Sequence, residues 1–186
     1  LSPREPEVKA YTQLLIKHGA ALVAIRESLC EVLTPRAAGN HAAVSGKEEK
    51  LGLLYVDRAK GDLEEAFAEV EEREMRRGVT LAGPHRDDLK LTISGRAARE
   101  YGSEGQQRTL ALALKLAQGE VLRERGKREP IYLIDDVFGE LDPRRRNALM
   151  ARFPKDAQKL ITTTTLEWWE DSEKLPTSQV VNGTLG

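Results

Sequence analysis

Residues 131–142 constrain the fold of this chain more than any other stretch, because an apolar run there ends abruptly in acids. They read I-Y-L-I-D-D-V-F-G-E-L-D. The run 131–134 is typical of a strand buried on both faces of a parallel sheet. Ligands of open α/β sheets bind beyond the carboxyl ends of such strands. The stretch therefore predicts an α/β protein with a site at Asp135 and Asp136.

The two carboxylates suit a magnesium ion and the activation of a water molecule. Mg²⁺ is usually held by one or two carboxylates together with nucleotide phosphates and water. Asp135 and Asp136 are therefore candidate metal-binding and catalytic residues. A strand that ends in a solvated Asp-Asp turn explains the same pattern, and the stretch alone leaves both interpretations open.

A helix start is predicted within residues 101–117, which read Y-G-S-E-G-Q-Q-R-T-L-A-L-A-L-K-L-A. Ser103 and Gln106 have the spacing of a capping box. The helix is expected to continue as an Ala/Leu-rich buried segment to Gly126. Free N–H groups at a helix start, beside a serine hydroxyl, can bind an anion. A simple helix cap is the alternative interpretation.

These two stretches, in this order, resemble the ABC-type ATPases of the chromosome-maintenance and repair branch. S-E-G-Q-Q at 103–107 is similar to their signature motif, 131–136 to Walker B, and Leu141-Asp142 to the D-loop. G-P-H-R-D-D at 83–88, followed by G-Q-Q-R-T-L-A-L-A-L-K-L-A at 105–117, more closely resembles the RecF family of DNA repair proteins. The motifs cover residues 80–165. Before residue 80 the resemblance rests on the arrangement of the predicted elements, which looks like the helical arm of that family.

The resemblance implies roles for the acids. Asp135 is expected to hold Mg²⁺, and Asp136 to polarise the attacking water, at a position where the common residue is Glu. Asp142 is expected to contact the partner subunit near the interface and to belong to the cofactor-binding residues. Many such ATPases carry a γ-phosphate-sensing histidine after the next strand. This chain has threonines there; Thr164 aligns best, and Thr163 nearly as well.

The resemblance also implies that Ser103, Gly105 and Gln106 contact a nucleotide bound by the other subunit. It implies ATP and Mg²⁺ as cofactors, an ATP-dependent homodimer, and binding to DNA with single-strand–duplex junctions. The implied function is recombinational repair and replication restart in the cytoplasm, with a place in the SOS response and RecO, RecR and RecA as associated proteins. A transporter-type ATPase subunit and a non-enzymatic helical partner-binding module are the alternatives.

Composition sets further limits on the chain. It has 186 residues, a net charge of −1 and one cysteine, Cys30. A single cysteine excludes an internal disulfide framework and fits a reducing compartment. No apolar run is long enough to span a membrane, and residues 1–10 carry no signal-peptide pattern. The charge balance does not indicate nucleic-acid binding, so a DNA-binding surface has to be a local patch.

Residues 1–79 are predicted to form a helical arm, and residues 80–186 the C-terminal part of an ATPase core. A long helix is expected over 6–33, ended by Pro35 and followed by a loop over 36–46. Apolar residues in steps of three and four form a heptad seam that predicts a partner helix, expected upstream of Leu1. The seam comprises Val8, Tyr11, Leu15, His18, Leu22, Ile25, Leu29 and Val32.

A second helix is predicted over 63–77, with Asp62 as its N-cap and Gly78 after its end. It is expected to pair with the first helix in antiparallel fashion. A strand over 50–56 precedes it. Strands over 89–93 and 96–101 are predicted to form a hairpin with a turn at Ser94-Gly95.

Polar groups around the remaining motifs leave alternatives open. His85 and Arg86 belong either to a self-paired polar turn or to a functional site, where Arg86 binds a phosphate of nucleotide or DNA. Asp142-Pro143 predicts a helix start, and Arg144, Arg145 and Arg146 follow, as a solvated face or a DNA contact.

Further strands are predicted over 159–163 and 179–185, and Trp168 and Trp169 are expected to pack a lid or surface patch. No G-x-x-x-x-G-K-[ST] motif occurs in the chain, so Walker A is absent from it. In the family that motif precedes the helical arm, and the chain is therefore interpreted as the C-terminal half of a RecF-like protein.

Overall fold

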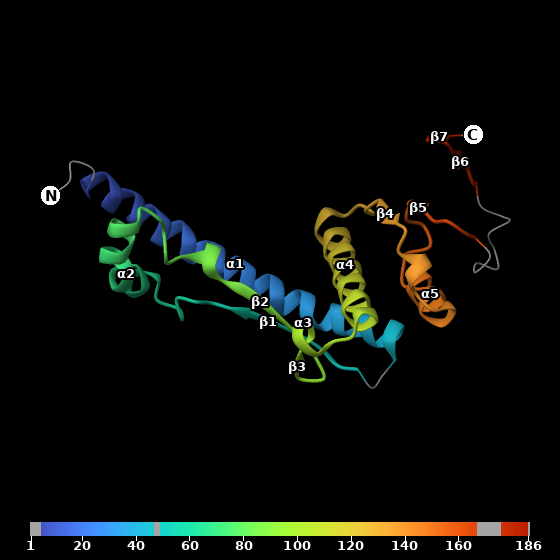
Figure 1. The fold of residues 1–186 in the computed structure, drawn as a ribbon, viewed down its shortest axis with the longest axis horizontal. Helices are drawn as coiled ribbons and strands as arrows, with labels where there is room; N and C mark the ends of the chain where they lie inside the picture. The colour runs from blue at the N-terminus through green and yellow to red at the C-terminus, as the bar shows by residue number, and fades with distance from the viewer. Residues whose placement is uncertain (1–4, 47–48, 167–175, 186) are drawn as a thin grey trace. The chain divides into compact units, whose positions relative to one another are not determined.

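The computed structural model describes residues 5–46, 49–166 and 176–185. The chain divides into two compact units, Leu1–Val121 and Leu122–Gly186. Figure 1 labels their helices and strands. The predicted division at residue 79 stays a prediction. The compact units do not coincide with it, because a strand before residue 79 pairs with one after residue 80.

Helix α1 (Glu5–Ser45) is much longer than predicted. The expected end at Pro35 and the expected loop over 36–46 are both wrong, since Pro35 lies inside the helix. Beyond the proline, the helix buries a stripe at helical spacing, at most 1% exposed, formed by Ala37, Asn40, His41 and Val44. Packing of this stripe outweighs the unfavourable proline, whose ring costs about 3 kcal/mol inside a helix.

Most residues of the predicted heptad seam lie on the solvent-exposed side of α1. Tyr11 is 69% exposed and Ile25 64%, and His18 is also exposed. The helix instead packs on its own unit through a second stripe of three-and-four spacing that includes Gly19, Cys30 and Ala37. No residue in the described part of the chain covers the seam along its length, so the partner helix stays a prediction.

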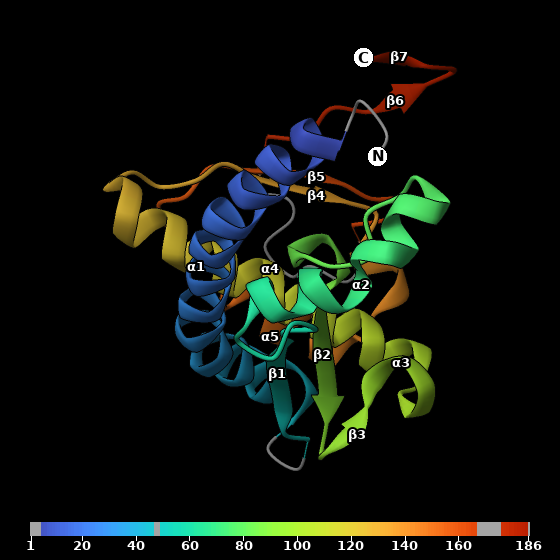
Figure 2. The ribbon, with the colours of Figure 1, turned by 90° about the vertical axis from the view of Figure 1, so that its left-hand side faces the viewer.

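The second helix is confirmed with its predicted bounds, as α2 (Leu63–Arg77). Asp62 Oδ1 accepts from the backbone N–H of Glu65 at 2.9 Å, and Gly78 ends the helix at a φ of 65°. Leu63 and Phe67 are buried. Helix α2 packs against α1 (Figure 2). Leu63 of α2 lies close to Gly19 of α1, since a Cβ added at Gly19 would be 3.1 Å from Leu63 Cδ1.

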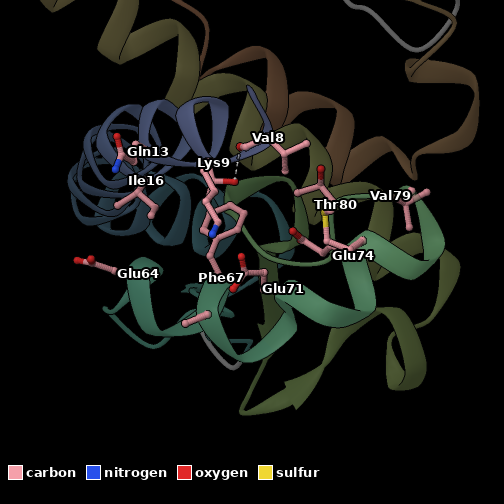
Figure 3. A pocket seen from close by; sticks show the side chains of 14 residues that line it. Val8, Lys9, Gln13, Ile16, Glu64, Phe67, Glu71, Glu74, Val79 and Thr80 are labelled. Atoms are coloured by element: carbon pink, nitrogen blue, oxygen red, sulfur yellow. Dashed lines mark hydrogen bonds between the residues drawn. The ribbon is translucent and has the colours of Figure 1, made fainter. Parts of the chain in front are cut away.

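A groove of about 610 Å³ lies between α1 and α2. Figure 3 shows Ile16 of α1 and Phe67 of α2 among its lining residues, with Val8 near Thr80 at the other end. Because the start of α2 lies at Gly19 and its end near Val8, the two helices run antiparallel, as the sequence predicts.

A three-stranded sheet lies against the second half of α1. Strand β1 (Leu51–Val56) pairs antiparallel with β2 (Asp88–Ile93), in a register that sets Leu51 opposite Ile93. Strand β3 (Arg96–Ala97) adds two residues, and α3 (Ala98–Tyr101) follows as a helical turn. The predicted strand over 96–101 is therefore wrong after Ala97, where Ala98 turns into the core.

Helix α4 (Glu104–Gly126) begins and ends where the sequence predicts. Its buried face contributes to the core of the first unit, together with one residue each from α1, β1, β2 and α3. The cluster comprises Ala37, Leu51, Ile93, Ala98, Leu110, Ala113 and Ala117. Asn40 Nδ2 donates to Glu120 Oε1 at 3.1 Å, which adds a polar link from α1 to α4.

The second unit contains a parallel pair, β4 (Tyr132–Asp135) and β5 (Lys159–Thr162). The predicted parallel strand exists, but burial on both faces is wrong here. Ile134 is buried, whereas Ile131 is 59% and Leu133 76% exposed. The described part of this unit provides one neighbouring strand and covers one face only.

The turn η2 (Phe138–Glu140) and helix α5 (Pro143–Met150) cover that face. Phe138 and Leu149 are fully buried there. Near the C-terminus, β6 (Val180–Val181) and β7 (Thr184–Leu185) form a small hairpin in place of the single strand predicted over 179–185, because Asn182 and Gly183 both take positive φ and turn the chain back.

Trp168 and Trp169 lie outside the described residues. Among the helices of the described ranges, none combines the length and hydrophobicity needed to cross a bilayer.

Candidate nucleotide site

The start of α4 carries the capping box that the sequence predicts. The backbone N–H of Gln106 donates to Ser103 Oγ at 3.3 Å, and the N–H of Ser103 donates to Gln106 Oε1 at 2.8 Å. Ser103 is exposed. The first N–H groups of any helix, here including Gly105, lack intrahelical acceptors. The helix start can therefore present N–H groups and a hydroxyl to an anion.

Gln106 is more constrained than the sequence suggests. Besides capping its own helix, its Nε2 donates to Glu49 Oε1 at 3.0 Å. Glu49 Oε2 in turn lies 3.7 Å from Nε2 of the buried His41. Gln106 therefore links the helix start to the C-terminal end of α1, a segment that the sequence predicted as a loop. This geometry favours a positioning role for Gln106.

Gly102 sets the angle at which the chain enters α4. Its N–H donates to the carbonyl of Ala98 at 3.0 Å, and its carbonyl accepts from Gln107 Nε2 at 3.0 Å. A Cβ on this residue would lie 2.6 Å from the Ala98 oxygen. Any larger residue would push α3 away from the helix start and disturb the position of Ser103.

In the second unit, Asp135 and Asp136 lie at the carboxyl end of β4, as predicted, and both are exposed. Asp135 is paired in register with Thr162 of β5. Thr162 Oγ1 donates to Asp135 Oδ1 at 2.5 Å and accepts from the backbone N–H of Asp136 at 3.0 Å. One threonine therefore bridges both acids, and sequence reasoning missed it.

Asp136 has a left-handed backbone, with φ of 47°. Asp and Asn are among the few residues that tolerate this region. Its Oδ1 faces Gly139, because a Cβ there would lie 3.4 Å away. The bend separates the two side chains, leaving Asp135 toward β5 and Asp136 toward the turn η2.

Asp142 is the N-cap of α5, as the sequence predicts. Its Oδ1 accepts from the N–H of Arg145 at 2.9 Å, and its Oδ2 lies 3.4 Å from Arg145 Nε. Arg146 Nε donates to the carbonyl of Leu141 at 2.5 Å. These contacts give Arg145 and Arg146 structural roles beside the D-loop motif.

The threonines after β5 differ in their availability. Thr163 Oγ1 donates to the carbonyl of Thr165 at 2.9 Å, which closes a local turn. Thr164 is exposed and lies beyond the strand end. Of the two candidates for the position of the sensing histidine, Thr164 has the more accessible hydroxyl.

The donor set around Asp135 suits Mg²⁺ in its usual nucleotide-bound form, with one carboxylate and a hydroxyl nearby and the remaining ligands from phosphate and water. Within the described ranges, His, Cys, Asp and Glu side chains form no group of three or more that could hold a metal by themselves. A magnesium site here depends on the nucleotide for its other oxygens.

The G-P-H-R-D-D motif forms a tightly held turn, η1 (Pro84–Arg86), in the first unit. Arg26 Nη1 donates to the carbonyl of Pro84 at 2.6 Å, and Arg86 Nη2 to that of Thr80 at 3.0 Å. Asp87 accepts from the Tyr55 hydroxyl and, at 2.9 Å, from the N–H of Arg58. Burial of the Tyr55 side chain raises its pKa most, and the hydrogen bond from its hydroxyl to Asp87 raises the pKa further.

The chain matches no protein-family model. It is 39% identical over 185 residues to the DNA replication and repair protein RecF of Nostoc punctiforme, covering 94% of this chain and 49% of that protein. With the RecF of Symbiobacterium thermophilum it shares 41% over 169 residues, 84% of this chain and 45% of that protein.

Two solved structures of RecF proteins are also similar to this chain. A structure described as the recombination mediator protein RecF-ATPrS in the RecFOR pathway superposes with a TM-score of 0.78 at 26% identity. The match covers 97% of this chain and 50% of that one. A RecF-ATP structure gives 0.72 at 29% identity over 88% of this chain and 46% of that one.

The capped helix start and the strand ending in two acids resemble the signature and Walker B motifs of the ABC-type ATPase class. Within that class the chain belongs to the RecF family. It spans about half the length of the curated relatives it matches.

Proposed function

We propose that this chain is part of an ATPase of DNA repair and replication that binds ATP and Mg²⁺ and closes as a homodimer on DNA. The observation that carries the proposal is the pair of exposed acids at the end of the parallel strands, where Thr162 binds the carboxylate of Asp135 and the backbone N–H of Asp136. The names of the curated relatives support the cellular role. The transporter-type and non-enzymatic alternatives have no comparable support.

In the proposed reaction, Asp135 contributes an oxygen to the metal site beside the nucleotide. The ion, when bound, neutralises charge on the β- and γ-phosphates. Asp136 orients the attacking water and accepts its proton as general base. Phosphoryl transfer depends mainly on positioning and charge stabilisation, which fits side chains held by strand ends and a capped turn.

The helix start acts on the nucleotide of the opposite subunit. Ser103 and the N–H of Gly105 donate to the γ-phosphate, with the partial positive charge of the helix N-terminus behind them. Gln106 holds this start in place, Asp142 supports the interface, and Thr164 donates to the γ-phosphate. A threonine hydroxyl carries no positive charge, so its contribution is smaller than that of a histidine.

The remaining assignments follow the family. Residues 1–79 form the helical arm and 80–186 part of the ATPase core. The assembled protein binds single-strand–duplex junctions, acts with RecO, RecR and RecA in the cytoplasm, and takes part in the SOS response. ATP binding closes the dimer on DNA, and slow hydrolysis then determines when the DNA is released.

The test is ATP turnover by the full-length protein with and without gapped DNA. DNA-stimulated hydrolysis, lost in Asp136→Asn, is expected. A partner-binding module shows no turnover in either condition, and a transporter-type ATPase shows turnover without a response to DNA. Either result contradicts the proposal.

A further inference from the structure

A cleft lined by four arginines lies in the first unit, and none of its lining residues belongs to the proposed ATPase chemistry. Its volume is about 490 Å³. The arginines come from three segments: the turn after β1, one face of α2, and the turn η1. The lining comprises Arg58, Val70, Arg73, Arg77, Leu81 and Arg86.

The positive charge of this cleft is not neutralised by nearby carboxylates. Within the part of the chain that the structure describes, none of the four guanidinium groups forms an ion pair. Of the acids next to these arginines in the sequence, Asp57, Glu74 and Asp87 accept hydrogen bonds from other donors. Asp87 accepts from Tyr55 and from the N–H of Arg58, and Glu74 Oε1 accepts from the N–H groups of Leu81 and Ala82.

Holding four like charges around one cleft costs energy through mutual repulsion, and a bound anion removes that cost. Arginine suits a phosphate in particular, since its planar fork donates two parallel hydrogen bonds to phosphate oxygens. Arg86 is already oriented by its bond to the carbonyl of Thr80. The net charge of the whole chain is −1, so this is a local basic patch.

We propose that the arginine cleft binds phosphates of the duplex DNA backbone. The inference rests on the proposed DNA-binding function and assigns part of it to named residues. The cleft offers exposed guanidinium groups and only two apolar side chains, Val70 and Leu81. It therefore contacts backbone phosphates and positions the protein on the duplex without reading its sequence.

Adjacent residues of α2 provide a matched pair of variants. Arg77 lines the cleft, whereas Arg76 does not, and its Nε donates to the carbonyl of Glu72. Both lie in the last turn of α2, so Arg77→Gln and Arg76→Gln remove the same charge from the same helix end. Arg77→Lys keeps the charge. The full-length variants are titrated onto labelled duplex DNA at several salt concentrations, with nucleotide held constant.

Arg77→Gln is expected to reduce the slope of log K against log salt by about 0.9, the value of one phosphate contact. That slope corresponds to a loss in affinity of roughly fivefold to tenfold near 0.1 M salt. Arg73→Gln combined with Arg77→Gln should lower the slope by about twice as much. Arg76→Gln and Arg77→Lys should leave the slope close to that of the wild type.

Equal effects of Arg76→Gln and Arg77→Gln overturn the proposal, because general surface charge then explains binding. Unchanged DNA affinity in the double variant also overturns it, and a fall in ATP affinity in the same variant assigns the cleft to free nucleotide instead. If the wild type binds no DNA at all, the proposed function itself has failed. Melting temperatures are measured alongside, and these exposed side chains should leave them unchanged.

Discussion

Thr162 Oγ1 donates to Asp135 Oδ1 at 2.5 Å, across the paired ends of β4 and β5. The same oxygen accepts from the backbone N–H of Asp136 at 3.0 Å, and the carbonyl of Thr162 accepts from that N–H at 3.2 Å. The left-handed bend of Asp136 is therefore supported from the neighbouring strand. Thr162 therefore holds the carboxylate of Asp135 and the backbone of Asp136.

Thr162→Val in the full-length protein is expected to lower ATP turnover by about tenfold while ATP binding stays near the wild type. Valine keeps the shape and strand preference but loses the hydrogen bond, and a bond to a charged group contributes roughly 1.5–3 kcal/mol. Thr162→Ser keeps the hydroxyl and should retain most turnover. Unchanged turnover in Thr162→Val would reduce Thr162 to an ordinary strand end.

Asp136→Asn in the full-length protein is expected to trap an ATP-bound dimer. Asparagine also tolerates a positive φ, so the bend survives while the general base is lost. Dimer lifetime in sedimentation should rise, and turnover should fall by about a hundredfold or more. Wild-type turnover in this variant would rule out Asp136 as the base.

Local signals account for the parts of the fold that the sequence predicts well. The bounds of α2 follow from Asp62 and Gly78, and the start of α4 follows from Ser103 and Gln106, because each cap bonds within a few residues. The N-cap at Asp142 is of the same kind. No knowledge of distant contacts is needed for any of them.

The predictions that fail depend on distant contacts. Pro35 does not end α1, because the next turns bury Ala37 and His41 in the core of the first unit. Thr162 was missed because its role depends on the parallel register of β4 and β5, which residue types do not reveal. The contact between Glu49 and Gln106 at the start of α4 was missed for a similar reason, because the two residues are far apart in the sequence.

The 186-residue chain by itself is expected neither to bind ATP tightly nor to hydrolyse it. It has no P-loop, whose N–H groups and lysine hold the phosphates. Titration calorimetry on the purified chain should show no binding at micromolar ATP. Micromolar affinity would mean that the described site binds nucleotide without that loop.

Tyr55→Phe should destabilise the chain by about 1–2 kcal/mol at neutral pH, because Asp87 loses a hydroxyl donor. The pKa of Tyr55 is raised in the folded state from its usual 10.0. The stabilisation is therefore fully present below that value and lost as pH rises through the folded-state pKa. Urea unfolding of both proteins at neutral and strongly alkaline pH measures the difference, which should shrink at high pH.

Tyr101→Phe is the matched control for Tyr55→Phe, since Tyr101 is 67% exposed and lies outside this hydrogen-bond cluster. It should change the free energy of unfolding by less than about 0.5 kcal/mol. Equal effects of the two substitutions would show that the bond to Asp87 is not what stabilises the turn.

Ser103 separates the two interpretations of the capped helix start. If its hydroxyl contacts the nucleotide of the opposite subunit, Ser103→Arg in the full-length protein should block ATP-driven dimerisation through its bulk. ATP binding to the monomer should stay nearly intact, because the nucleotide is held by the other parts of its own subunit. ATP-dependent sedimentation and nucleotide affinity are the two measurements.

Ser103→Ala supplies the control, since it removes the cap without adding bulk. Loss of an N-cap costs about 0.5–2 kcal/mol, so both variants should melt at a similarly lowered temperature. Only the arginine variant should lose the dimer completely, while the alanine variant should weaken it through the missing hydroxyl. If ATP-dependent dimers of Ser103→Arg form normally although its stability falls, Ser103 is a helix cap and makes no contact across the interface.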